Sequence, residues 1–233
     1  DSFARSVLEC EYAEDEIDTL LDEVWGGYDL LALSVPSQET VGGRFMVHAS
    51  AIEISMYQVL LLRGQSKEQA TKLIYDMVWH IYTKMGAIPW DLATLFRNNE
   101  YDKLRFATTA FRTFPFSSPS YRWQEIEAEP GVVAFNCLKC PVAEYFQSHN
   151  LSELCVSTWC TLDDPLAKQW GAELKRTGTI AGGAKMCDFR WRGLHVPEAK
   201  GSSETLSDES EQLRDVKSAR KIISLREVHE TSL

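Results

Sequence analysis

Cysteines are concentrated in one part of this chain of 233 residues. Five of the six lie within residues 137–187, where thiols could act as nucleophiles or bind a metal. These five are Cys137, Cys140, Cys155, Cys160 and Cys187. The first two form a C-x2-C pair and the next two a C-x4-C pair, so a tetrathiolate zinc site is one interpretation.

The spacing argues against that zinc site. Cys155 and Cys160 fall on a predicted helix, where two side chains five residues apart point to different faces. A thioredoxin-like redox pair is also disfavoured, because the C-x2-C follows an antiparallel hairpin strand and not a βαβ unit. We therefore expect no metal and no cofactor, and several cysteines that are free, buried thiols.

Residues 160–191 combine the groups that small-molecule catalysis needs. Cys160 and Cys187 are the candidate nucleophiles. Asp163 and Asp188 are the candidate general acids or bases. A thiol beside a carboxylate suits the addition of a nucleophile to an unsaturated carbon and the transfer of the proton that this requires.

An arginine and two threonines form a candidate substrate-binding set. Arg176 suits an anionic ligand, because a guanidinium can hold a carboxylate in a fork of two hydrogen bonds. Thr177 or Thr179 would donate further hydrogen bonds to the substrate. Two strands, at residues 173–180 and 185–191, are predicted to carry this set, with a Gly-Gly hairpin turn between them.

Strand alternation divides these groups between two faces. Cys187 and Asp188 point in opposite directions if their strand is regular. The working pair is then Cys187 with Asp163, or Asp188 with Cys160. The alternative interpretation is that Arg176 and Asp188 only form a cross-strand ion pair.

The elements before this block are predicted from hydrophobic periodicity and from turn residues. Helices are expected at residues 3–24, 44–63 and 66–85, the last with a capping box at Ser66 and Gln69. Glycines should end the first helix at 26–27 and the third at 86, leaving 28–43 irregular. Further helices and strands are predicted as follows: helices after Pro89 and at 103–111, 141–148 and 151–159, and strands at 121–127 and 132–135.

This order of elements predicts an α+β fold, with N-terminal helices packed on a small antiparallel sheet. We expect an acidic helix and irregular segment at residues 1–43 and a single catalytic-like domain at 44–196. Residues 197–233 are rich in Gly, Ser and Glu, which predicts a flexible tail with a possible short helix.

Charge and hydropathy exclude several classes of protein. The net charge is −10, and nine acids against one base in residues 1–24 account for −8 of it, so nothing resembles a basic surface for nucleic acid. No run of about 20 apolar residues predicts a membrane span, and no signal peptide is visible after Asp1. We expect a cytoplasmic protein whose partner is a small-molecule substrate. The oligomeric state stays open.

The ordered set of motifs resembles the L-2-amino-thiazoline-4-carboxylic acid hydrolase family over residues 44–192. The matching pieces run along the chain in this order: a strand ending in Asn136-Cys137, Leu151-Ser-Glu-Leu154, Cys160-x-x-Asp163, Arg176-Thr177-x-Thr179-Ile-Ala-x-Gly183 and Cys187-Asp188-Phe189-Arg190. The resemblance implies hydrolytic opening of a cyclic amidine at a C–N bond, yielding a carbamoyl-cysteine. It also favours Cys187 as the nucleophile, because the neighbours of this cysteine recur in the family motif.

Two other functions are compatible with the same residues. The scaffold could run an isomerase, lyase or cyclase step in a specialised biosynthetic pathway. It could also bind a small acidic or apolar ligand without turnover, because seven Trp, eight Tyr and ten Phe are enough to line a pocket. Turnover would need the thiols or carboxylates, and binding alone would not.

Overall fold

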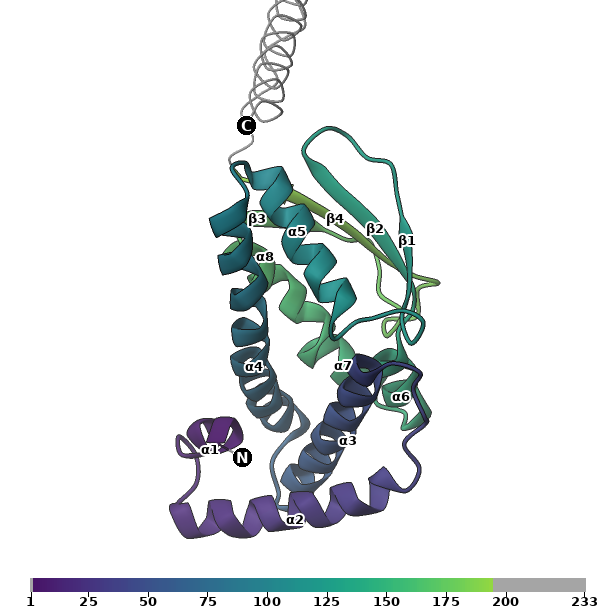
Figure 1. Ribbon diagram of the computed structural model, residues 1–233. Coiled ribbons are helices and arrows are strands. Elements are labelled where there is room, and N and C mark those ends of the chain that lie inside the picture. The colour runs from purple at the N-terminus through teal and green to yellow at the C-terminus, as the bar shows by residue number, and fades with distance from the viewer. Residues whose placement is uncertain (1, 195–233) are drawn as a thin grey trace, which may run out of the picture. The chain divides into compact units, whose positions relative to one another are not determined.

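The computed structural model describes residues 2–194, and side chains from residue 4 onward; the predicted tail at 197–233 lies outside this part. The α+β prediction is confirmed (Figure 1). The helices are α1 Ser2–Leu8, α2 Glu14–Ala32, α3 Val41–Leu62, α4 Lys67–Phe96, α5 Glu100–Thr113, α6 Pro141–Ser148, α7 Ser152–Thr158 and α8 Asp163–Gln169, with a 3-10 turn at Cys160–Leu162. The strands are β1 Arg122–Glu125, β2 Val132–Lys139, β3 Ala172–Lys175 and β4 Cys187–Gly193.

Helix α4 begins where the sequence predicts and ends later. The capping box of Ser66 and Gln69 is formed, but the helix continues through Gly86 and Pro89. A Cβ at Gly86 would lie 2.3 Å from Leu166 Cδ1, and the indole of Trp170 donates to the Gly86 carbonyl at 3.0 Å. The glycine therefore admits α8 to the surface of α4, and this tertiary packing outweighs its low helix propensity.

Helix α2 also continues past its predicted end. It passes through Gly26 and Gly27, so that residues 28–32 are helical and not irregular. A Cβ at Gly27 would lie 2.4 Å from the hydroxyl oxygen of Ser55, which donates to the Val24 carbonyl at 2.7 Å. As in α4, a glycine that reads as a stop signal serves close helix packing.

The four strands form one antiparallel sheet in the order β1-β2-β4-β3. Cys137 pairs with Cys187 and Phe135 with Phe189 across the two central strands. The predicted hairpin at 173–191 is only partly formed, because β3 stops at Lys175 and residues 176–186 make a loop. Strand alternation therefore does not apply to Arg176, and the Gly-Gly turn lies within this longer loop.

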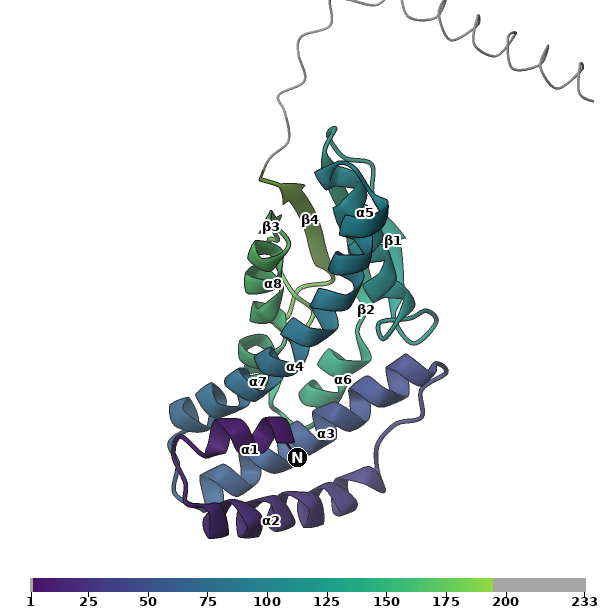
Figure 2. The ribbon, with the colours of Figure 1, turned by 60° about the vertical axis from the view of Figure 1, so that its left-hand side comes forward.

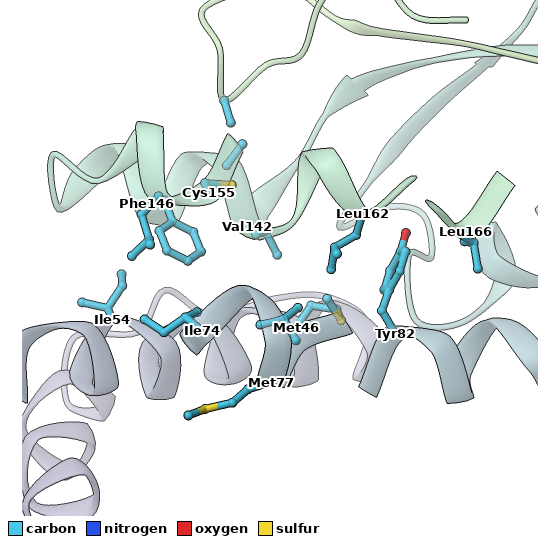
Figure 3. Close-up of a cluster of buried hydrophobic side chains, with 14 of the residues drawn as sticks. Met46, Ile54, Ile74, Met77, Tyr82, Val142, Phe146, Cys155, Leu162 and Leu166 are labelled. Carbon is cyan, nitrogen blue, oxygen red and sulfur yellow. The ribbon is translucent and has the colours of Figure 1, made fainter. Parts of the chain in front are cut away.

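Helix α4 packs against different helices at its start and further along its length. At its start it packs with α1, α3 and α7, and further along it packs with α5 and α8, which also contact the sheet (Figures 1 and 2). The buried core continues between these layers. Figure 3 shows α3 and α4 side chains, among them Met46 and Ile74, meeting Val142, Phe146 and Leu162 from the segments above them.

Helix α3 is long and apolar enough, by length and composition, to cross a membrane. In this structure most of it is buried by protein, with α2, α4 and α6 packed around it. It also carries three fully or almost fully buried polar residues, Ser50, Glu53 and Ser55. These features describe a core helix.

Candidate active site

A cavity of about 110 Å³ lies between the sheet and helices α4, α5, α7 and α8. Its wall is mainly aromatic, with Phe111, Phe116, Trp123, Phe135 and Trp170 among the lining side chains. From β4 it receives Cys187, Phe189 and Trp191, which alternate along the strand and so lie on one face of it. A concave, largely apolar site with a few polar groups is what a small-molecule pocket requires.

All five cysteines of the 137–187 cluster line this cavity, and each is a free thiol. The convergence was not predicted, because Cys155 and Cys160 were expected on different faces of one helix. Helix α7 ends at Thr158, and the chain then tightens into the 3-10 turn, which brings these two thiols into hydrogen-bond contact. Within residues 2–194, no group of three or more His, Cys, Asp or Glu side chains is arranged to hold a metal.

Cys160 is the thiol best prepared to ionise. A hydrogen bond from the Cys155 thiol, the positive charge of Arg176 and a hydrogen bond from Thr179 lower the Cys160 pKa, against the opposing effect of burial and of Asp163. The hydrogen bond to Cys160, and after it burial, raise the pKa of Cys155, which therefore keeps its proton and donates it. A thiolate is the nucleophilic form of cysteine, so this pair has one donor and one nucleophile.

Cys187 differs from Cys160 in this respect. Burial raises its pKa to about 11, although the backbone N–H of Ile180 donates to its sulfur at 3.2 Å. The prediction that Cys187 and Asp188 face opposite ways is confirmed, because Cys187 lines the cavity and Asp188 does not. Cys187 thus stays protonated near neutral pH.

Asp163 and Arg176 form a buried ion pair at the cavity wall. Arg176 Nη1 donates to Asp163 Oδ2 at 2.6 Å, and the Tyr82 hydroxyl donates to Oδ1 at 2.7 Å. Both side chains of the pair are close to one-eighth exposed, at 13% and 12%. Burial raises the Asp163 pKa despite these favourable contacts. Figure 3 shows Tyr82 rising from α4 with its hydroxyl between Leu162 and Leu166.

Arg176 also holds the chain at Cys160. Its Nη2 donates to the Cys160 carbonyl at 2.6 Å, and its guanidinium lies over the Phe189 ring, 5.3 Å from the centroid. The alternative cross-strand pair with Asp188 is wrong, because Arg176 pairs with Asp163 instead. One guanidinium therefore links the thiol-bearing turn to the carboxylate that follows it.

Asp188 lies on the outside of the same loop. Its carboxylate accepts backbone N–H bonds from Thr177 at 2.9 Å and Gly178 at 3.0 Å, and a 2.8 Å bond from the Thr177 hydroxyl. Partial burial acts to raise the Asp188 pKa, but these hydrogen bonds together outweigh it and lower the pKa. Neither Thr177 nor Thr179 lines the cavity: Thr177 binds Asp188, and Thr179 donates to Cys160 and accepts from the Gly182 N–H at 3.0 Å.

Sequence reasoning missed three polar residues at or near the site. Tyr82 lies in an apolar stripe, which predicts only a core position. Glu53 is buried in α3, where it accepts hydrogen bonds from Thr158 and from the Trp159 indole, just before Cys160. Burial raises its pKa to about 8. The sequence signal that could have identified Glu53 is an acidic residue inside an apolar helix. Arg112 of α5, which also lines the cavity, has no comparable signal.

Comparisons with solved structures found weak likenesses. The Fe(II) unliganded H-NOX protein from K. algicida is 8% identical, with a TM-score of 0.42 over 84% of this chain and 97% of that chain. A mutant of the same protein is 7% identical, with a TM-score of 0.40 over 82% and 92%. These values are too low to transfer a fold or an activity. No curated protein matches the chain.

The comparison with protein families gave a direct match. The sequence model described as L-2-amino-thiazoline-4-carboxylic acid hydrolase matches residues 44–191. The match includes every residue that lines the cavity, from Met46 to Trp191. It ends within one residue of the range over which the motifs were predicted to resemble this family. The chain therefore belongs to the L-2-amino-thiazoline-4-carboxylic acid hydrolase family.

Proposed function

We propose that this protein hydrolyses a cyclic amidine of the 2-amino-thiazoline-4-carboxylate type by breaking its ring C–N bond, with Cys160 as the nucleophile. The observation that carries this proposal is the placement of a thiol with a lowered pKa in the same cavity as the Asp163–Arg176 pair. The raised pKa of Cys187 supports choosing Cys160 in its place. Family membership supports the reaction class.

The first half-reaction joins the substrate to the enzyme. The Cys160 thiol first passes its proton to the Asp163 carboxylate. The resulting thiolate adds to the amidine carbon, the C=N electron pair moves to the ring nitrogen, and that nitrogen takes the proton from Asp163. The ring C–N bond then breaks. The exocyclic amino group forms the new C=N bond and passes one proton to the departing nitrogen, which becomes a free amine.

The second half-reaction releases the product. Water adds to the same carbon, and the bond from carbon to the Cys160 sulfur breaks. The oxygen becomes a carbonyl, its proton restores Asp163, and the thiolate is regenerated. The net change is the addition of one water to the substrate, giving a carbamoyl product.

The surrounding residues fit these steps. The raised pKa of Asp163 favours a carboxyl group that can give up a proton inside the cavity, and Arg176 beside it stabilises the anion left behind. Hydrogen bonds from Cys155 and Thr179 stabilise the thiolate before attack and after release. Asp188 shapes the loop from outside and takes no part in proton transfer.

The test is incubation of the full chain with L-2-amino-thiazoline-4-carboxylate, followed by mass spectrometry of product and protein. We expect a product heavier by one water that carries a free amine, and an adduct on Cys160 when the reaction is quenched early. A product with a free thiol would show C–S cleavage and overturn the choice of bond. Binding without turnover of any cyclic amidine would favour a ligand-binding protein.

A further inference from the structure

A second arginine, Arg112, lines the cavity together with Arg176. Arg112 comes from the C-terminal turn of α5, and its guanidinium lies over the Phe135 ring, 4.2 Å from the centroid. Its side chain is only 12% exposed, and it lines both the buried cavity and a groove on the outer surface beside β1. Trp123 lines both spaces too, so these two residues stand at the boundary between them.

The partners of Arg112 leave donors available. Its ion pair is with Glu125, whose side chain is 73% exposed. Its other contacts are long, with 3.4 Å from Nε to the Thr108 carbonyl and 3.4 Å from Nη2 to the Thr109 hydroxyl. Hydrogen bonds of this length are weak, and a guanidinium has five N–H donors.

The two cavity arginines therefore differ in how strongly their N–H donors are already bound. Arg176 makes two bonds of 2.6 Å, to Asp163 and to the Cys160 carbonyl, and its carboxylate partner is buried. Losing that partner would leave a buried charge without compensation. The partner of Arg112 would return to water, where a free carboxylate is well solvated.

We propose that Arg112 is the carboxylate anchor of the substrate, and that Glu125 holds this position until the substrate replaces it. The inference rests on the proposed function and names its substrate class: small cyclic compounds with a single carboxylate. The aromatic wall formed by Trp123, Phe135 and Phe189 would contact the ring, and Arg112 would bind the acid at the entrance. This role was predicted for Arg176, whose guanidinium is instead bound to Asp163.

The test measures binding and does not depend on turnover. The probes are 2-aminothiazole-4-carboxylate, whose aromatic ring resists opening, and its neutral 4-carboxamide, each titrated calorimetrically against the full chain. We expect wild-type protein to prefer the acid at least tenfold, and Arg112→Gln to remove that preference. Glu125→Gln should tighten acid binding severalfold and leave amide binding unchanged, because the competing carboxylate is gone.

Controls separate this inference from the proposed function. Arg192→Gln, which removes a surface ion pair with Glu129, should leave both affinities unchanged. The inference is overturned if Arg112→Gln keeps the preference for acid, or if Glu125→Gln leaves acid binding as it was. If wild-type protein binds the acid through Arg112 but opens no cyclic amidine, the proposed function is wrong and the assignment of Arg112 as carboxylate anchor is supported.

Discussion

The inner and outer sides of the 176–188 segment each involve one aspartate, and the two carboxylates serve different purposes. On the inner side, Arg176 and Cys187 line the cavity and Arg176 binds Asp163. On the outer side, Asp188 accepts three hydrogen bonds from Thr177 and Gly178. Reactive and supporting groups thus alternate along one short stretch of chain.

The two aspartates show what this difference means physically. Burial raises the Asp163 pKa, so its carboxyl group can take part in proton transfer near the cavity. For Asp188, burial acts to raise the pKa, but the hydrogen bonds from the loop together outweigh it and lower the pKa, so the group stays ionised. Both aspartates were candidates because they lie in the same block of sequence, residues 160–191. Only their surroundings in the structure distinguish their roles.

The largest expected effect is on the thiols of the inner side. Cys160→Ser should lower turnover on the order of 10³-fold, because a hydroxyl is a much weaker nucleophile than a thiolate. Cys187→Ser should lower it less than tenfold, since this thiol is protonated near neutral pH. Steady-state kinetics would measure both, with circular dichroism to verify folding. The reverse order would restore Cys187 as the nucleophile.

The next effect is on stability through the buried ion pair. Asp163→Ala should reduce the free energy of unfolding by about 3–5 kcal/mol, because Arg176 would be left buried without its counter-charge. Urea denaturation would measure this. The matched variant Asp163→Ala with Arg176→Met should recover part of the loss without recovering turnover. If the single variant is as stable as wild type, the pair is not a structural element of the site.

A third buried carboxylate, Glu53, lies on α3 beside the chain that leads into Cys160 and allows a test by pH. Its pKa is raised by burial from 4.5 to about 8, so the folded state binds a proton that the unfolded state loses near pH 4.5. The contribution is fully present below pH 4.5 and is lost as pH rises to about 8, with a slope of up to about 1.4 kcal/mol per pH unit.

Glu53→Gln is the variant that isolates this contribution. It keeps the shape of the side chain and should flatten the pH dependence of unfolding between pH 4.5 and 8. Thermal melts across this range, with wild type in parallel, would measure the difference. Equal slopes for the two proteins would mean that burial does not raise the pKa of Glu53.

The smallest effect is expected on the outer side. Asp188→Asn should cost about 1 kcal/mol in unfolding free energy, because weaker bonds to the Thr177 and Gly178 backbone remain. Turnover should fall by less than tenfold, through looser placement of Arg176. The same kinetic assay and denaturation series would report it. A loss as large as that of Cys160→Ser would place Asp188 in the chemistry and end the distinction between the two sides.

Local signals in the sequence predicted much of the fold. The capping box fixed the start of α4, and the Pro141 start of α6 was predicted at the residue where the helix begins. The ends of α2 and α4 were predicted wrongly, because Gly27 and Gly86 serve contacts with residues distant in sequence. A single sequence does not distinguish a packing glycine from a terminating one.

Only part of the candidate site was predicted from the sequence: Cys160, Asp163, Arg176 and Cys187 line the cavity, and the contacts between them were not predicted. Alternation along β4 correctly separated Cys187 from Asp188, because it is a property of the strand alone. The pairing of Arg176 with Asp163 depends on where β3 ends and on the approach of α8. The contact between Cys155 and Cys160 depends on a change from α-helix to 3-10 turn, which the residue types there do not predict.

The five thiols of the cavity offer a way to learn what the pocket accepts. Only one of them, Cys160, has a lowered pKa. Within the cavity, a library of weakly electrophilic fragments would therefore react mainly at this sulfur. Each fragment's labelling rate there, measured in a variant that lacks the exposed Cys10, would report how well its shape fits the aromatic wall. The fragments that react fastest would then show which ligand shapes the cavity accepts, and the experiment needs no natural substrate.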